Sequence, residues 1–142
     1  MTTDYGLEHV NAVIRVFGLS RFGCAKPNHP GEHMNNLKAV SEDDAFLSKV
    51  GPLCEAVGEW FQSRPDKPFV AVFVCKEGRH RSVTASRLWA ELCRRKGFTV
   101  SLRHLCHWNW WGCRGKCAEC DHAAPGKKAF FDNFAVNLDC LW

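Results

Sequence analysis

The sequence predicts a small α/β domain with three layers and a mainly parallel sheet. The run Phe69–Cys75 is apolar on both alternating faces, which is the pattern of a strand covered on both sides by helices. An apolar stripe with helical spacing follows, carried by Ala85, Leu88 and Leu92, and Gly97 is placed to act as the C-terminal cap of this helix. Residues 98–105 then return to a strand-like pattern. These elements form a β-α-β unit, so we expect a right-handed crossover and two parallel strands.

The residues before this unit predict one more strand, a long loop and a helix. Residues 10–17 are rich in β-branched side chains and predict the first strand. Residues 19–40 contain scattered glycine and proline with little periodicity, which indicates a loop. A helix is expected over 42–63, with Ser41 as its N-cap. Pro52 lies inside it, where a kink or a break is compatible with the sequence.

After residue 105 the composition changes to tryptophan, cysteine and glycine, which indicates a compact irregular lobe. Pro125 is expected to open a last helix whose apolar face docks on the sheet. That face comprises Phe130, Phe131, Phe134 and Leu138. We therefore expect the 142 residues to form a single domain, with a core over about 9–105 and the lobe and last helix over about 106–142.

Composition and charge limit the classes of function. Hydrophobic residues make up 46% and charged residues 24%, as in globular proteins, and no apolar run approaches the ~20 residues of a membrane span. No secretory signal pattern is present, and nine cysteines are an odd number for a disulfide framework, so a cytoplasmic protein with reduced thiols, a metal site or both is expected. The sequence leaves the oligomeric state open.

The net charge of +4 is concentrated in one basic segment between Lys76 and Arg103, which favours anionic partners. For Arg94, Arg95 and Lys96 a solvated helix end is the favoured interpretation, because cations there complement the helix dipole.

The most informative stretch is the loop that joins the strand ending at Cys75 to the following helix. Backbone N–H groups and the helix dipole favour an anion at such a junction, and phosphate is the natural guest. Gly78 allows the backbone to approach a ligand, and Arg81 can present a fork of donors. Alternatively, Arg81 pairs with Glu77 or Asp66. The predicted loop contacts are Cys75, Lys76, Glu77, Gly78, Arg79, His80, Arg81 and Ser82.

The pattern Cys75-x-x-Gly78-x-His80-Arg81-Ser82-Val83 resembles the C-terminal domain family of RapZ, the RNase adapter protein. Arg103-His104 is similar to that family's arginine-histidine pair, and Pro27–Pro30 corresponds to its Pro-Asn-Pro segment, although the preceding Asp-x-Arg is missing. The resemblance covers about residues 10–105. It implies a loop that binds a phosphorylated metabolite, with Arg103 and His104 at the site, and a basic surface that binds structured RNA. No nucleotide-hydrolysing G-x-x-x-x-G-K-[ST] run occurs.

The same loop also satisfies the signature of the cysteine-dependent phosphatases, Cys75 followed by five residues and Arg81. In that family the cysteine attacks phosphorus and the arginine holds the phosphoryl oxygens. Surrounding cations and a helix N-terminus would lower the pKa of Cys75, but Val74 replaces the histidine usual before the cysteine and no general acid stands out. We therefore favour binding without catalysis and keep the phosphatase as the alternative.

The irregular lobe contains a second candidate site. Cys113, Cys117, Cys120 and His122 provide enough soft ligands for one tetrahedral zinc ion. The three-cysteine spacing also matches the iron-sulfur motif of radical SAM enzymes, but the chain is too short for their barrel. The alternative to zinc is a set of reduced thiols.

Overall fold

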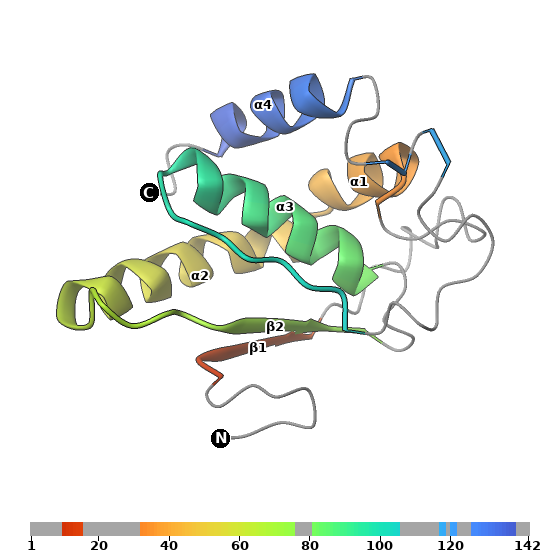
Figure 1. Cartoon of the computed structure of the whole chain (residues 1–142). Coiled ribbons are helices and arrows are strands. Elements are labelled where there is room, and N and C mark those ends of the chain that lie inside the picture. Colours follow the sequence, from red (N-terminus) through yellow and green to blue (C-terminus); the bar gives the residue numbers. More distant parts are fainter. Residues whose placement is uncertain are drawn as a thin grey trace.

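The structure is a computed structural model, and it describes residues 10–15, 32–75, 81–105, 117–118, 120–121 and 126–138. In chain order the elements are β1 (Ala12–Arg15), α1 (Met34–Ser41), α2 (Asp44–Ser63), β2 (Ala71–Val74), α3 (Arg81–Arg95) and α4 (Lys127–Asn137) (Figure 1). The mixture of helices with a small parallel sheet confirms the predicted α/β class.

The sheet pairs β1 with β2 in parallel, in a register that runs from Ala12 opposite Ala71 to Arg15 opposite Val74. Asn11 extends the pairing, because its backbone N–H donates to the Val70 carbonyl at 2.8 Å and its side-chain oxygen accepts from the Val70 N–H at 2.6 Å. Both strands lie within the ranges predicted for them. Parallel strands need a crossover, which α1 and α2 supply.

The strand predicted over 98–105 is wrong, since these residues form an extended segment outside the sheet. The parallel neighbour of β2 is therefore β1, and the predicted β-α-β unit through α3 does not form. Phe98 and Val100 pack against the core, whereas Thr99 and the residues at 101 and 103 are exposed. Packing against the core therefore gives this segment the alternation of buried and exposed side chains that is also typical of a strand. The Val100 carbonyl accepts from the Arg94 guanidinium at 3.5 Å instead of a neighbouring strand.

The helices lie on one side of the sheet in Figure 1. Side chains agree with this view, because Ala12 and Ile14 pack against the core whereas Val13, between them, is 52% exposed. The described helices thus cover one side of the sheet. The three-layer arrangement of the predicted domain stays a prediction.

The predicted loop over 19–40 is wrong at its end, because α1 begins at Met34. His33 caps this helix, its Nδ1 accepting from the Asn35 N–H at 3.1 Å. Leu37 and Val40 are fully buried, and they account for a helix of only eight residues in this place. Glycine and proline just upstream concealed this short apolar stripe in the sequence pattern.

The predicted N-cap of α2 is also wrong. Ser41 ends α1, and the Asp43 carboxylate instead accepts from the Ala45 and Phe46 N–H groups at 2.8 and 3.2 Å. The helix continues unbroken through Pro52 to Ser63.

The core lies between the helices and the inner face of the sheet. Phe131 and Phe134 of α4 are buried, and the Phe134 ring stacks on Phe46 of α2 with centroids 6.5 Å apart. The last helix thus packs against α3 and α2, not on the sheet as predicted. Apolar side chains on neighbouring helices offer α4 a larger surface than a two-stranded sheet, which explains the difference.

The predicted C-terminal cap of α3 is confirmed. Gly97 has a φ of +93°, its N–H donates to the Arg94 carbonyl at 3.0 Å, and the Phe98 N–H donates to the Cys93 carbonyl at 3.1 Å. These two bonds are those of a Schellman motif.

Candidate functional site

The end of β2 and the start of α3 are held together by Cys75 and Ser82. The Cys75 thiol donates to the Ser82 hydroxyl at 3.1 Å, and the Ser82 backbone N–H donates to the sulfur at 3.4 Å. Ser82 is buried, and Cys75 is half-buried at the carboxyl end of the strand. The end of the strand and the start of the helix therefore lie next to each other, as predicted for this junction. The loop residues Lys76, Glu77, Gly78, Arg79 and His80 lie outside the described residues.

Two arginines of the predicted site lie within the described residues. Arg81 is half-buried in the first turn of α3 and, within the described part of the chain, forms no ion pair. It does not pair with Asp66, and Glu77, the other predicted partner, lies outside the described residues. Arg103 is exposed at the end of the extended segment.

His104 contacts a side chain that the sequence did not single out. Its Nε2 lies 3.2 Å from Oε2 of Glu32, the residue two positions before α1. Glu32 Oε1 lies 3.7 Å from Arg87 Nε and 3.4 Å from Lys127 Nζ. Only 2% of Glu32 is exposed. One buried carboxylate therefore joins the segment before α1 to α3, to α4 and to the extended segment.

Arg87 and Lys127, the two basic residues that contact Glu32 besides His104, each have a further partner. Lys127, which is 1% exposed, donates to the Cys120 carbonyl at 2.9 Å and so ties α4 to the lobe. Arg87 also pairs with Glu91 at 3.3 Å, and its guanidinium lies 5.0 Å from the ring centre of Phe131. Such shared contacts compensate for the cost of removing charges from water.

The charges of the cluster set its protonation. Burial alone would raise the pKa of Glu32, but the hydrogen bond with His104 and the positive charges of Arg87 and Lys127 outweigh it, so the pKa lies below its usual value. Burial lowers the pKa of Lys127, and Glu32 opposes that effect. Glu32 is therefore ionised at neutral pH and acts only as an acceptor, which requires the proton of the shared hydrogen bond to reside on His104 Nε2.

Sequence reasoning missed Glu32, Arg87 and Lys127 as members of one cluster. Glu32 fell in the predicted loop, and Lys127 was not singled out in the predicted last helix. One signal was present: a lysine in the first turn of a helix opposes the helix dipole and so calls for a nearby anion.

The lobe residues give a partial view of the predicted zinc site. Cys117 is half-buried and Cys120 is buried, and neither forms a disulfide bond. Cys113 and His122 lie outside the described residues. No cluster of three or more candidate ligands occurs among the residues that the structure does describe. Zinc binding stays a prediction.

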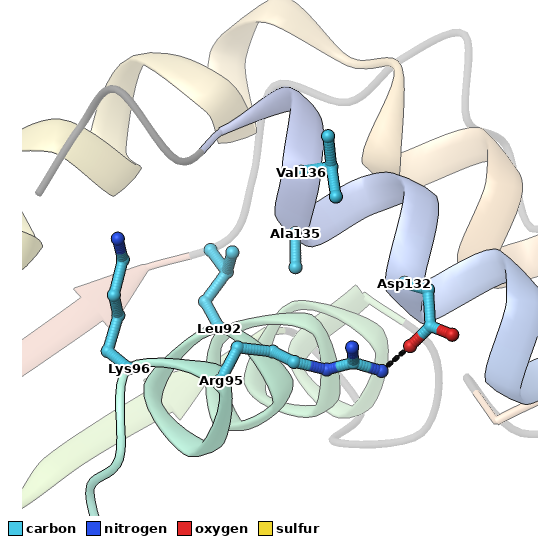
Figure 2. A pocket seen from close by; sticks show the side chains of 6 residues that line it. All are labelled: Leu92, Arg95, Lys96, Asp132, Ala135 and Val136. Atoms are coloured by element: carbon cyan, nitrogen blue, oxygen red, sulfur yellow. Dashed lines mark ion pairs between the residues drawn. The ribbon is translucent and has the colours of Figure 1, made fainter.

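A hollow of about 230 Å³ lies between the C-terminal halves of α3 and α4 (Figure 2). Leu92 and Ala135 contribute buried apolar side chains, and an ion pair between Arg95 and Asp132 crosses one side. Because Asp132 offsets the charge of Arg95, this hollow is a poorer anion site than the opposite end of α3. Arg94 likewise pairs with Glu91 at 3.0 Å, and RNA binding by this basic surface stays a prediction.

A comparison with protein-family models, curated proteins and solved structures finds no match to this chain. Among the helices that the structure describes, none is both long and apolar enough to cross a membrane.

Proposed function

We propose that this protein binds phosphate or a phosphorylated small molecule at the junction of β2 and α3 and does not cleave it. The contact between Cys75 and Ser82 carries the proposal, because it holds the first turn of α3 against the carboxyl end of β2. Ligands of α/β proteins gather at that edge of a sheet, and a helix N-terminus favours an anion.

The side chains near this junction suit an anionic ligand. Arg81 can offer two parallel N–H donors to phosphoryl oxygens, since no ion pair engages it within the described residues. Arg103 is exposed and can add donors from the extended segment, next to His104, whose Nε2 contacts Glu32. The intervening loop residues complete the proposed set: Lys76, Glu77, Gly78, Arg79 and His80.

Isothermal titration calorimetry with inorganic phosphate and phosphosugars tests this proposal. Replacing Arg81 by alanine should weaken binding about tenfold or more, because charged hydrogen bonds contribute about 1.5–3 kcal/mol each. Arg64→Ala is the matched control, since Arg64 is exposed beyond the end of α2 and stacks on Trp60. Equal affinities of the wild type and Arg81→Ala would contradict the proposal, as would the absence of binding.

The cysteine-dependent phosphatase is a second candidate, favoured by the two groups that surround the Cys75 sulfur. A backbone N–H and a hydroxyl at a helix N-terminus can stabilise a thiolate. In this reaction the sulfur would bond to phosphorus as the alcohol or phenol leaves, and water would then release phosphate. Asp43 already caps α2, which makes it a poor general acid. Hydrolysis of an aryl phosphate that disappears in Cys75→Ser would favour the enzyme over the binding module.

A further inference from the structure

We infer that Cys117 and Cys120 form a redox-active pair, which exchanges with small disulfides of the glutathione class and closes to an intramolecular disulfide. The inference is independent of the phosphate site proposed at the junction of β2 and α3. Neither cysteine forms a disulfide bond in the structure. A spacing of two residues between cysteines is typical both of zinc ligands and of redox pairs, so the choice between them rests on the geometry of the turn.

The turn brings the two cysteines within reach of each other. The Cys117 carbonyl accepts from the Cys120 N–H and from the Asp121 N–H, each at 3.1 Å. The first of these bonds closes a four-residue turn, whose end Cα atoms lie less than about 7 Å apart. Cysteines separated by more than about 7 Å cannot be bridged without movement of the backbone, and this pair meets that limit. The second bond continues the turn as in an α-helix, where side chains three positions apart lie on the same face.

Burial gives the two thiols different roles. Cys120 is 2% exposed, whereas Cys117 is half-buried and its neighbour Ala118 is exposed. A small disulfide from solvent can therefore reach the Cys117 sulfur, while the Cys120 sulfur meets a reagent only after that reagent is bonded to Cys117. Thiol–disulfide exchange passes through such a mixed disulfide, which a second thiol then resolves. Cys117 is thus the attacking thiol and Cys120 the resolving thiol.

Lys127 holds the buried cysteine in its place. Its Nζ atom donates to the Cys120 carbonyl at 2.9 Å and lies 3.4 Å from Oε1 of Glu32. Lys127 and Glu32 are themselves almost completely enclosed, so the backbone at Cys120 is tied to the interior of the domain. This anchor keeps position 120 buried while position 117 stays near the surface, as the two assigned roles require.

The exchange with glutathione disulfide takes two balanced steps. The Cys117 thiolate first attacks one sulfur of the reagent, so that a bond forms between these two sulfurs, the S–S bond of the reagent breaks and one glutathione thiolate leaves. The Cys120 thiolate then attacks the Cys117 sulfur of the mixed disulfide and releases the second glutathione thiolate. The cysteines lose two electrons to the reagent, and the two protons that they lose are taken up by the released thiolates.

Incubation of the purified protein with glutathione disulfide tests the inference. The reaction is stopped with acid, the protein is denatured and alkylated, and tryptic peptides are identified by mass spectrometry. Trypsin releases both residues in the peptide 117–127, which contains no other cysteine. This peptide should become lighter by two hydrogen atoms and resist alkylation until a reductant is added. Cys54 and Cys93, buried in the core, are the matched controls and should remain reduced.

Two variants test the separate roles of the thiols. Cys120→Ser should accumulate glutathione on Cys117, because no thiol remains to resolve the mixed disulfide. Cys117→Ser should lose all modification of this peptide, because the Cys120 sulfur is enclosed. If either variant fails to fold, the wild-type reaction stopped at early times replaces it, and mixed disulfide should then be found on Cys117 and not on Cys120.

Several results would overturn the inference. They are a peptide 117–127 that stays fully reduced, a disulfide that joins Cys117 or Cys120 to a different cysteine, and glutathione that appears on Cys120 before Cys117. A purified protein that carries one zinc ion and whose two thiols become oxidised only after a chelator is added would also overturn it, because both residues would then be metal ligands.

Discussion

The Nζ atom of Lys127 lies 3.4 Å from Oε1 of Glu32, and both side chains are almost completely excluded from solvent. The two residues are far apart in sequence, at the start of α4 and before α1. A lysine in the first turn of a helix works against the helix dipole, so the fold must compensate for it elsewhere. The buried carboxylate provides that compensation and fixes α4 to the domain.

Replacing Lys127 by methionine should therefore destabilise the protein by about 3 kcal/mol, because it leaves part of the charge on Glu32 uncompensated in the interior. The neighbouring Lys128 is the control: it is 88% exposed and pairs with Asp132 in the same helix. Lys128→Met should cost less than about 1 kcal/mol. Urea unfolding followed by circular dichroism measures both, and equal losses would show that the buried pair contributes no more than a surface one.

Acid should weaken the fold through Glu32. Its pKa in the folded protein lies below the usual value of 4.5, so the unfolded chain binds more protons as pH falls through this range. The stabilising contribution is thus complete above about pH 4.5 and is lost as pH falls through the lower, folded-state pKa.

The measurement is the thermal midpoint as a function of pH between neutral and strongly acidic solution. Glu32→Gln cannot titrate at this position, so its midpoint should fall less steeply than that of the wild type. Parallel curves for wild type and Glu32→Gln would show that this carboxylate does not contribute to acid sensitivity.

Local patterns in the sequence predicted the parts of the fold that depend on neighbouring residues. The run ending at Cys75, the stripe of α3 and the cap at Gly97 are all present, because strand alternation, helical spacing and a left-handed glycine are short-range properties. The segment 98–105 failed because alternating burial against helices resembles alternating burial in a sheet.

The candidate site likewise contains contacts that local sequence patterns predict and contacts that they do not. The contact between Cys75 and Ser82 could be predicted, since a strand-to-helix junction brings these two residues together locally. The link between Glu32, His104 and Lys127 could not, because it depends on how α1, α3 and α4 pack. Pairing over such sequence separations leaves no periodic signal.

Reactivity towards an alkylating reagent should distinguish Cys75, at the candidate site, from Cys54 and Cys93 in the core. Burial raises the pKa of Cys54 to about 11, and burial together with neighbouring Cys54 raises that of Cys93 to about 12. At about pH 8 the thiolate fraction of either residue is of order one in a thousand or less, whereas Cys75 is half-buried at a helix N-terminus.

Brief treatment with iodoacetamide, followed by peptide mass spectrometry, should label Cys75 and leave Cys54 and Cys93 unmodified. Inorganic phosphate should slow labelling of Cys75 if it binds at the β2–α3 junction, and sodium chloride at equal ionic strength controls for salt. Denatured protein, in which all three thiols should react, verifies detection. Faster labelling of Cys54 or Cys93 than of Cys75 would contradict the burial seen in the structure.

Two glycine substitutions should change stability in opposite directions. Gly97 has a φ of +93° in the cap of α3, a conformation that alanine adopts only with strain, so Gly97→Ala should destabilise by about 1 kcal/mol. Gly58 lies inside α2, and a Cβ atom built there meets no other atom within 4 Å. Gly58→Ala should therefore stabilise by about 0.5–1 kcal/mol through its helix propensity. Urea unfolding of both variants measures the difference, and equal signs would contradict the left-handed cap or the continuous helix.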